Sequence, residues 1–241
     1  MLSVQNLSMG NAVRNTSFSA FSGQITGIFG LIGSGRTEAA KVVAGVLKRD
    51  LFHGGQVRLN GRSVRYRVPR PAVRDGIIYV TEDRKIEGFF ETMSIAENIY
   101  LGAMAGGRAN SATVSMNEMK RLAKEWIAAL NVRAPNGDTR VIELSGGNQQ
   151  KIVVAKALVQ KPKLIIFDEP TRGVDVGAIA EIHQLIGRLA DDGIAVIVIS
   201  SYLPEILQLS DRILVCRQGR VVEEFDGGKT NEETIMYAAV H

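Results

Sequence analysis

The sequence contains a single cysteine, Cys216, in 241 residues, so an intramolecular disulfide is excluded. This cysteine lies in the apolar run 213–216, which favours a buried structural thiol over a nucleophile. Long hydrophobic runs are also absent, because the longest aliphatic run, 194–199, is far shorter than the roughly 18 to 20 residues of a membrane-spanning helix. Residues 1–20 lack the basic start and the apolar stretch of a secretory signal. We therefore expect a cytoplasmic chain that reaches a membrane only through a partner.

The sequence also has little net charge and few histidines. There are 29 Lys and Arg residues against 25 Asp and Glu, a net charge of +4, which is small for a dedicated nucleic-acid-binding protein. The one biased segment, 58–74, holds six arginines, and we interpret it as a solvated face rather than a nucleic-acid site. The histidines have no partners at metal-ligand spacing, which disfavours zinc and histidine-based nucleophilic catalysis. They are His53, His183 and His241.

Short apolar segments alternate with helical patterns along the chain. At roughly 150 residues per domain, the length fits one large domain or a core with a sizeable insertion. The apolar segments are 25–29, 77–80, 164–167 and 194–199, and the helical patterns cover 37–47, 178–189 and 204–209. This alternation predicts an α/β fold in which crossover helices connect a mostly parallel sheet. Segments 164–167 and 194–199 are apolar at every position, so we expect them to be central strands covered on both faces.

Three other stretches depart from this alternation. Segments 2–7 and 13–18 predict an antiparallel hairpin, and so do segments 213–217 and 220–225. Between about residues 94 and 159 the pattern is helical, without a convincing strand. The sequence therefore predicts an antiparallel β layer beside the parallel core and a helical insertion.

Glycines are concentrated in the segment 30–37, directly after one predicted strand and before a predicted helix. Its sequence, Gly-Leu-Ile-Gly-Ser-Gly-Arg-Thr, fits the phosphate-loop pattern except that Arg36 stands where the pattern has lysine. Such glycines let the backbone aim N–H groups at a phosphate, and the following helix presents its positive end. Thr37 is the expected hydroxyl ligand of Mg²⁺. A glycine-rich turn without a ligand is the alternative interpretation, so a second element is needed.

The second element is a pair of carboxylates, Asp168 and Glu169, that follow the apolar strand 164–167. Open α/β sheets bind ligands at the carboxyl ends of their strands, so both side chains are expected at the phosphate site. Asp168 suits the shell of a Mg²⁺ ion, and Glu169 suits the polarisation of a water for attack on a terminal phosphate.

A third segment, Leu-Ser-Gly-Gly-Asn-Gln-Gln at 144–150, precedes a helical run. Free N–H groups at Ser145, Gly146 and Gly147, together with the helix dipole, would form an anion site. Taken alone, the segment would favour the interpretation of a simple helix N-cap with a glycine turn.

Together these motifs resemble the nucleotide-binding domain of ATP-binding cassette (ABC) transporters, over nearly the whole chain from about Leu2 to Val240. Three further stretches, 79–85, 171–177 and 200–205, are similar to the C-terminal cassette of the fused double-cassette proteins that power bacterial monosaccharide importers of the ribose and galactose type. The resemblance implies a P-loop NTPase fold in one domain, 1–241. Its RecA-like core would cover about 1–90 and 160–241, and its helical subdomain about 91–159.

The resemblance also implies ATP and Mg²⁺ as cofactors and a head-to-tail pairing with a second cassette. In such a pair, residues 145–147 contact the nucleotide that the partner binds, and the loop 82–91 and the helical insertion dock on a membrane permease. The implied nucleotide-binding residues are Gly30, Leu31, Ile32, Gly33, Ser34, Gly35, Arg36, Thr37, Glu38, Val13, Ser145, Gly146, Gly147 and Gln149. The implied catalytic residues are Glu169, Ser201 and Glu82, and the implied metal ligands are Thr37, Asp168 and Glu82.

The chain departs from the family pattern at its own nucleotide site. Arg36 replaces the lysine, Glu82 replaces a glutamine, and Ser201 replaces a histidine. No aromatic residue between positions 2 and 13 is available to stack on adenine, so Val13 or Met9 would supply an apolar contact. Since the Ser-Gly-Gly segment is intact, we expect this site to bind ATP and to hydrolyse it weakly, while the partner's site carries most turnover.

Two other functions remain open at the level of the sequence. A soluble ABC-type ATPase acting on nucleic acid or ribosomes would use the same phosphate chemistry, and only the arginine segment 58–74 favours it. A binding module that closes on ATP without hydrolysing it is the other. The expected location of an importer subunit is the cytoplasmic face of the cell membrane, as a peripheral protein.

Overall fold

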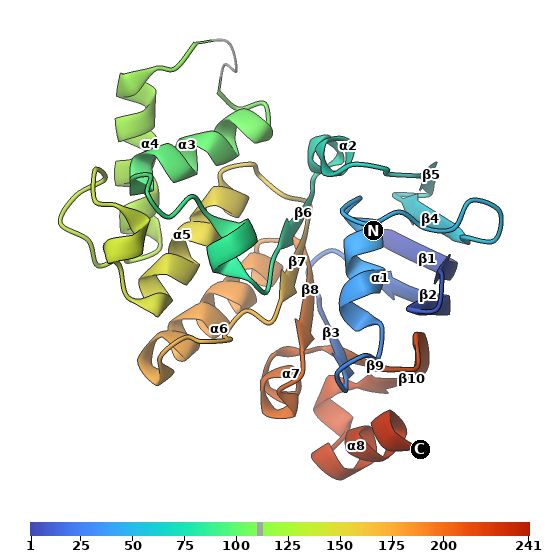
Figure 1. Ribbon diagram of the computed structural model, residues 1–241. Coiled ribbons are helices and arrows are strands. Elements are labelled where there is room, and N and C mark those ends of the chain that lie inside the picture. The colour runs from blue at the N-terminus through green and yellow to red at the C-terminus, as the bar shows by residue number, and fades with distance from the viewer. Residues whose placement is uncertain (110–112) are drawn as a thin grey trace. The chain divides into compact units, whose positions relative to one another are not determined.

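The computed structural model describes residues 1–109 and 113–241, which form two compact units (Figure 1). The first unit comprises residues 1–79, 163–169 and 183–241, and the second comprises residues 80–162 and 170–182. The predicted helical insertion includes residues 110–112, which lie outside the described residues. The predicted division into a RecA-like core and a helical subdomain stays a prediction, with its boundaries as given above.

The first unit contains a six-stranded sheet in the order β10-β9-β3-β8-β7-β6. Its strands are β3 (Ile25–Gly30), β6 (Ile77–Val80), β7 (Leu164–Asp168), β8 (Ala195–Ser200), β9 (Arg212–Arg217) and β10 (Arg220–Asp226). Strands β3, β7, β8 and β9 pair in parallel, whereas β9 and β10 form the predicted antiparallel hairpin. Every residue of β7 and β8 is buried, which confirms that these two apolar segments are interior strands.

A second, antiparallel sheet has the order β2-β1-β4-β5. It contains the predicted hairpin of β1 (Leu2–Met9) and β2 (Val13–Ala20), and also β4 (Gln56–Leu59) and β5 (Arg62–Val64). The last two strands come from the arginine-rich segment, where the sequence predicts only a solvated face. They form because Val57 and Leu59 alternate with outward-facing Arg58, and because Asn60 and Gly61 adopt the left-handed turn of a tight hairpin.

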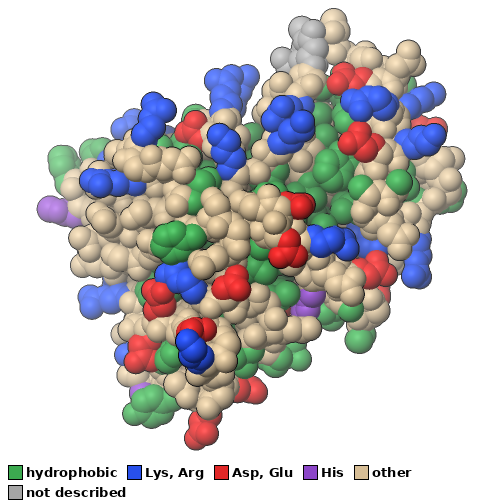
Figure 2. All heavy atoms as spheres, turned by 180° about the vertical axis from the view of Figure 1, so that it is seen from behind, with side chains coloured by type: hydrophobic (Ala, Val, Ile, Leu, Met, Phe, Trp, Pro, Cys, Tyr) green, Lys and Arg blue, Asp and Glu red, His purple; other side chains and the backbone are tan. Residues whose placement is uncertain are grey.

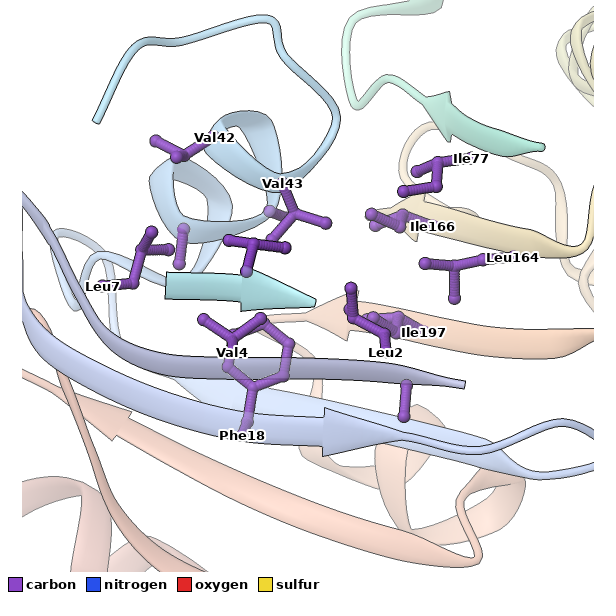
Figure 3. Close-up of a cluster of buried hydrophobic side chains, with 14 of the residues drawn as sticks. Leu2, Val4, Leu7, Phe18, Val42, Val43, Ile77, Leu164, Ile166 and Ile197 are labelled. Carbon is purple, nitrogen blue, oxygen red and sulfur yellow. The ribbon is translucent and has the colours of Figure 1, made fainter. Parts of the chain in front are cut away.

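Both sheets share one hydrophobic core with helix α1 (Arg36–Val43). Figure 3 shows Val43 of α1, Val4 of β1 and Ile166 of β7 directed into this cluster. The predicted helix extends to residue 47, but α1 ends at Val43 because Gly45 adopts a left-handed conformation, with φ of 75°. This packing fixes the position of the loop between β3 and α1.

The remaining helices of the first unit follow strands or end the chain. They are α2 (Pro69–Asp75), α7 (Leu203–Leu209) and α8 (Glu232–Val240). Helix α6 (Val176–Asp191) begins in the second unit and ends in the first. The sequence predicts α6 and α7 within two residues of their observed ends.

The second unit is helical, as the sequence predicts for residues 94–159. Its helices are α3 (Ile95–Ala105), α4 (Met116–Ala129) and α5 (Gly146–Leu158), with one π-helical turn at Arg84–Gly88 and one 3₁₀ turn at Val141–Glu143. A capping box of Ser94 and Glu97 starts α3, and Ser115 caps α4. Among the described residues, no helix is both long enough and apolar enough to span a bilayer.

Candidate nucleotide-binding site

The predicted phosphate loop connects the end of β3 to the start of α1. Gly30 is required at the strand end, because a Cβ atom there would lie 2.5 Å from the Ser34 Oγ and 2.6 Å from the Cys216 carbonyl oxygen. Gly35 has a φ of 86°, and a Cβ atom there would lie 2.2 Å from the Ala12 carbonyl oxygen. No atom lies within 4 Å of the Cβ position at Gly33. The loop therefore has the backbone freedom that a phosphate cradle needs, with open space beside Gly33.

Arg36 folds back into this loop and is buried. Its Nη1 donates to the Leu31 carbonyl oxygen at 2.7 Å and to the Ser34 Oγ at 3.4 Å. Its Nη2 forms an ion pair with the Glu169 Oε1 at 2.9 Å, and both side chains are about nine-tenths buried. The Nε atom is buried without a hydrogen-bond partner. The guanidinium therefore links the loop to the carboxylate that the sequence predicts to be catalytic.

Asp168 ends β7 and is completely buried. Its Oδ1 accepts a hydrogen bond from the Thr37 Oγ1 at 3.1 Å, and its Oδ2 accepts one from the Tyr79 Oη at 2.5 Å. Burial raises the pKa of the Asp168 carboxyl, while the hydrogen bonds from Tyr79 and Thr37 oppose that rise. Thr37 and Asp168 thus present adjacent oxygen donors, the ligand type that Mg²⁺ prefers.

Glu169 follows β7 in a left-handed backbone conformation, with φ of 48°. The backbone N–H of Ser201 donates to its Oε1 at 2.7 Å, and the Ser200 Oγ lies 3.5 Å from its Oε2. A non-glycine residue in this conformation is strained, and such strain is concentrated at functional sites. Glu169 is therefore oriented by Arg36 and by the turn that follows β8.

Two residues that were not predicted from the sequence, Tyr79 and Ser200, contact the carboxylates of the site. Ser200 is the polar residue that ends the otherwise apolar strand β8, and Tyr79 is the one residue of β6 with a polar group. Their side chains contact the two carboxylates because β6, β7 and β8 are neighbours in the sheet. The strand order is what the sequence alone does not provide.

In the second unit, the segment 145–147 forms the start of α5. Ser145 occupies the N-cap position, but its Oγ accepts a hydrogen bond from the Asn148 Nδ2 at 3.0 Å and makes no side-chain cap. Gly147 packs tightly, because a Cβ there would lie 2.4 Å from the Ala178 Cβ. Ser145 and Gly147 line a small hollow of about 120 Å³, together with the cations Arg133 and Lys151 and the acids Asp175 and Glu181.

The sequence profile of the family described as "ABC transporter" matches residues 13–172. The chain belongs to the ABC transporter family. It is an ABC-type ATPase domain, and its P-loop NTPase fold combines the antiparallel sheet, the mostly parallel sheet and the helical unit. The predicted family, fold class and enzyme class are thereby confirmed.

Curated relatives of this cassette are import proteins. A ribose import ATP-binding protein of Caldanaerobacter subterraneus subsp. tengcongensis is 40% identical over 240 residues, which cover 100% of the chain and 48% of the relative. A ribose import ATP-binding protein of Burkholderia pseudomallei strain K96243 is 43% identical over 240 residues, which cover 100% of this chain and 46% of the relative. The chain therefore spans about half the length of the curated relatives it matches.

Solved ABC transporter cassettes have the same fold. A nucleotide-free structure aligns with a TM-score of 0.81 at 24% identity and covers 99% of this chain and 94% of the other. A cassette bound to ADP and Pi, in a dimer described as a post-hydrolysis state, aligns with a TM-score of 0.78 at 23% identity. This alignment covers 94% of this chain and 98% of the other. At this identity the likeness establishes the fold alone.

Two residues predicted to contact the nucleotide have buried side chains. Val13 is completely buried in the core of the first unit, so its side chain is not exposed for the predicted contact with adenine, which stays a prediction. Gln149 is also buried, and its amide donates to the Val141 carbonyl oxygen at 3.3 Å, so its side chain is not exposed for the predicted contact. In both cases the packing of neighbouring elements decides the side-chain environment.

Two further predicted residues have partners that the sequence does not indicate. The Glu82 carboxylate forms an ion pair with Arg172 inside the second unit. Ser201 contacts Glu169 through its backbone N–H rather than its side chain.

The predicted buried thiol is confirmed, because Cys216 is 3% exposed and burial raises its pKa to about 12. Among the described residues, no group of three or more His, Cys, Asp or Glu residues is arranged to hold a metal ion.

Asp168→Asn is expected to stabilise this cassette while weakening its binding of MgATP. Because the pKa of Asp168 is raised in the folded state, its ionised form opposes folding, and stability falls as pH rises from the ordinary carboxyl pKa to the raised one. Removing this charge should raise the unfolding midpoint at pH 7. The gain is reduced by the cost of one accepted hydrogen bond, because the Asn amide nitrogen cannot accept from Tyr79 or Thr37. Thermal unfolding and titration with MgATP measure the two effects.

The matched control is Asp226→Asn. Asp226 is exposed, and Lys229 lowers its pKa, so removal of its charge should not raise the unfolding midpoint. An Asp168→Asn variant that is less stable than the parent chain at pH 7 would contradict this interpretation of the buried carboxylate.

Proposed function

We propose that the chain is the ATP-binding cassette that supplies energy to a bacterial monosaccharide importer, in which its own nucleotide site binds MgATP and hydrolyses it slowly. The ribose import relatives at 40% and 43% identity support the transport role. Their length, about twice that of this chain, supports a second cassette as partner, in the same polypeptide. The resemblance to the C-terminal half rests on the motifs of the sequence.

The ion pair between Arg36 and Glu169 carries the proposal of slow hydrolysis. A carboxylate that polarises water must have an oxygen free to accept a hydrogen bond from it. In Glu169, Oε1 accepts from both the Arg36 Nη2 and the Ser201 N–H, each within 2.9 Å. Oε2 contacts the Ser200 Oγ at 3.5 Å and can still accept a hydrogen bond from water. The guanidinium nevertheless fixes the orientation of the carboxylate and stabilises its negative charge, so we expect the attack of water to be slow while the ion pair is present.

The loop still fits a bound nucleotide. Its open side at Gly33 and the adjacent oxygens of Thr37 and Asp168 match a phosphate chain with a Mg²⁺ ion. The ion, when bound, neutralises charge on the phosphates. The loop N–H groups from Gly30 to Thr37 would hold the phosphates, Thr37 and Asp168 would hold the ion, and Glu38 would lie in the first turn of α1. Glu82 would contribute only after release from Arg172.

The segment 145–147 would serve the partner's nucleotide. Ser145 is exposed at the start of α5, where free backbone N–H groups and the positive end of the helix dipole suit a phosphate group. In the hollow beside it, Arg133 and Lys151 are balanced by Asp175 and Glu181, so the helix start carries this proposal. The chain therefore retains the segment 145–147 that we propose binds the partner's nucleotide, while Arg36 restrains Glu169 in the chain's own site.

The loop 82–91 is proposed to dock on the permease. Ile86 is 81% exposed and Phe90 is 55% exposed, although both are large hydrophobic residues. Exposed apolar side chains on one short segment suit a protein interface. The cassette would act as a peripheral protein at the cytoplasmic face of the membrane.

The alternative is a soluble ABC-type ATPase that acts on nucleic acid or ribosomes. The six arginines of segment 58–74 are all exposed, which is the observation in its favour. Tyr66, the aromatic residue of that segment, is buried and cannot stack on a base. The import relatives also support the transporter. A module that binds ATP without hydrolysis differs from our proposal only in the turnover measured below.

The isolated chain is expected to bind MgATP and to hydrolyse it at no more than a few per cent of the rate of the paired cassettes. The reason is that its own site lacks the partner's Ser-Gly-Gly segment and holds Glu169 on Arg36. Equilibrium binding of a fluorescent ATP analogue and a phosphate-release assay, each with and without the partner cassette, measure both properties. Rapid hydrolysis by the chain alone would refute the asymmetry, and failure to bind MgATP would refute the nucleotide site.

A further inference from the structure

A second basic hollow lies in the first unit, where three sequence segments meet. It has a volume of about 270 Å³ and is bordered by the β4–β5 hairpin, the end of α2 and the residue that precedes β7. The polar side chains that line it are Asn60, Arg62, Ser63, Arg74, Asp75 and Lys163. Figure 2 shows Lys and Arg side chains gathered over the region of β4, β5 and α2, with few acidic side chains among them.

The charges of this hollow are unbalanced. Arg62, Arg74 and Lys163 have no ion-pair or hydrogen-bond partner for their side chains among the described residues. The one acid, Asp75, accepts a hydrogen bond from the Tyr66 Oη at 2.5 Å, so one of its oxygens is already engaged. Three cations and one carboxylate leave two positive charges at neutral pH. Three cations around one hollow repel one another, and a negatively charged ligand bound there would offset this repulsion.

The hollow is separate from the nucleotide site. Lys163 directly precedes β7, whereas Asp168 ends that strand and Glu169 follows it. At about 3.3 Å per residue, the five residues of β7 separate the two ends by roughly 16 Å. The stem of the Lys163 side chain passes close to Gly76, since a Cβ atom at Gly76 would lie 3.1 Å from the Lys163 Cγ. The two sites therefore lie at opposite ends of the same strand.

We propose that this hollow binds the phosphomonoester of a small polar molecule, such as a sugar phosphate. Two arginines and a lysine match a phosphate dianion in charge, and arginine forks bind its oxygens in pairs. The Ser63 hydroxyl and the Asn60 amide supply hydrogen bonds for hydroxyl groups. The volume is close to the lower end of small-molecule sites. The buried Tyr66 leaves no aromatic surface for stacking of a nucleic-acid base.

The test is a titration of the full 241-residue chain with glucose 6-phosphate, followed through its backbone amide NMR signals at physiological salt. We expect saturable shifts at residues 60–64, 74–76 and 163, and weaker binding of inorganic phosphate at the same positions. Shifts confined to residues 30–37 would overturn the proposal while supporting the nucleotide site, so the two failures are distinguishable. Glucose itself should cause no shifts.

Arg62→Gln and Arg74→Gln should each weaken glucose 6-phosphate binding about tenfold, because each removes charge-assisted hydrogen bonds. The matched control is Arg67→Gln, an exposed arginine of the same segment that does not line the hollow. Equal weakening by the control would overturn the proposal, since it would mean general electrostatic attraction. Binding to vesicles of phosphatidate but not to glucose 6-phosphate would also overturn it, because the phosphate would then be presented by a lipid.

Discussion

Ser145→Arg is expected to lower ATP hydrolysis by the paired cassettes roughly 100-fold, although Ser145 lies outside this chain's own phosphate loop. The residue is exposed beside a hollow of only about 120 Å³ that already contains Arg133 and Lys151. A third cation with a long side chain would fill this hollow and block the segment proposed to contact the partner's nucleotide. Phosphate release at saturating MgATP, from the chain combined with its partner cassette, measures the loss.

The informative comparison is with Glu169→Gln in the same assembly. This substitution removes the proposed catalytic carboxylate from the chain's own site, which we expect to contribute little turnover, so the rate should fall less than about fivefold. Ser115→Arg, at the N-cap of α4 in the same unit, controls for the effect of a new arginine at a helix start. It should cost roughly 1 kcal/mol of stability and leave hydrolysis unchanged. A larger loss from Glu169→Gln than from Ser145→Arg would show that the assignment of the two sites is reversed.

Arg36→Lys is expected to raise hydrolysis at the chain's own site at least tenfold. The Arg36 guanidinium contacts Leu31, Ser34 and Glu169 with two nitrogens in a fixed plane. A lysine ammonium is compact and has one nitrogen, so it cannot maintain all these contacts and is available to a phosphate. Glu169 would then be free to act on water, and general base catalysis contributes about 100-fold or more. Glu82 and Ser201 still differ from the family pattern, which is why we expect only part of that gain.

The gain should be measured in an assembly whose partner site has been inactivated, so that hydrolysis reports on this chain's own loop. Arg212→Lys is the matched control, because Arg212 also pairs with a carboxylate, that of Glu224, in the same unit. It should leave hydrolysis unchanged. The affinity for ATP gives a second readout, and it should rise with Arg36→Lys as the loop carbonyl of Leu31 is released. A variant that binds ATP more tightly but hydrolyses it no faster would refute the restraint of Glu169 by Arg36.

Much of the fold follows from local sequence patterns. The apolar segments became strands, the helical stretch 94–159 contains α3, α4 and α5, and glycines mark the loop before α1. These features depend on side-chain periodicity and backbone freedom, which neighbouring residues determine. Strands β4 and β5 were not predicted, since four and three residues give too short an alternation to distinguish from a charged loop.

The sequence by itself determined the family, the alternation of core strands with crossover helices, and the residues that could form a phosphate site. Only the tertiary structure decided how those residues are used: Arg36 pairs with a carboxylate 133 positions away, and the Val13 side chain is buried in the core. It also joined Arg62, Arg74 and Lys163 around one hollow. The physical reason is that a motif fixes the local backbone, whereas the partner of a side chain depends on strand order and packing between segments that are distant in the sequence.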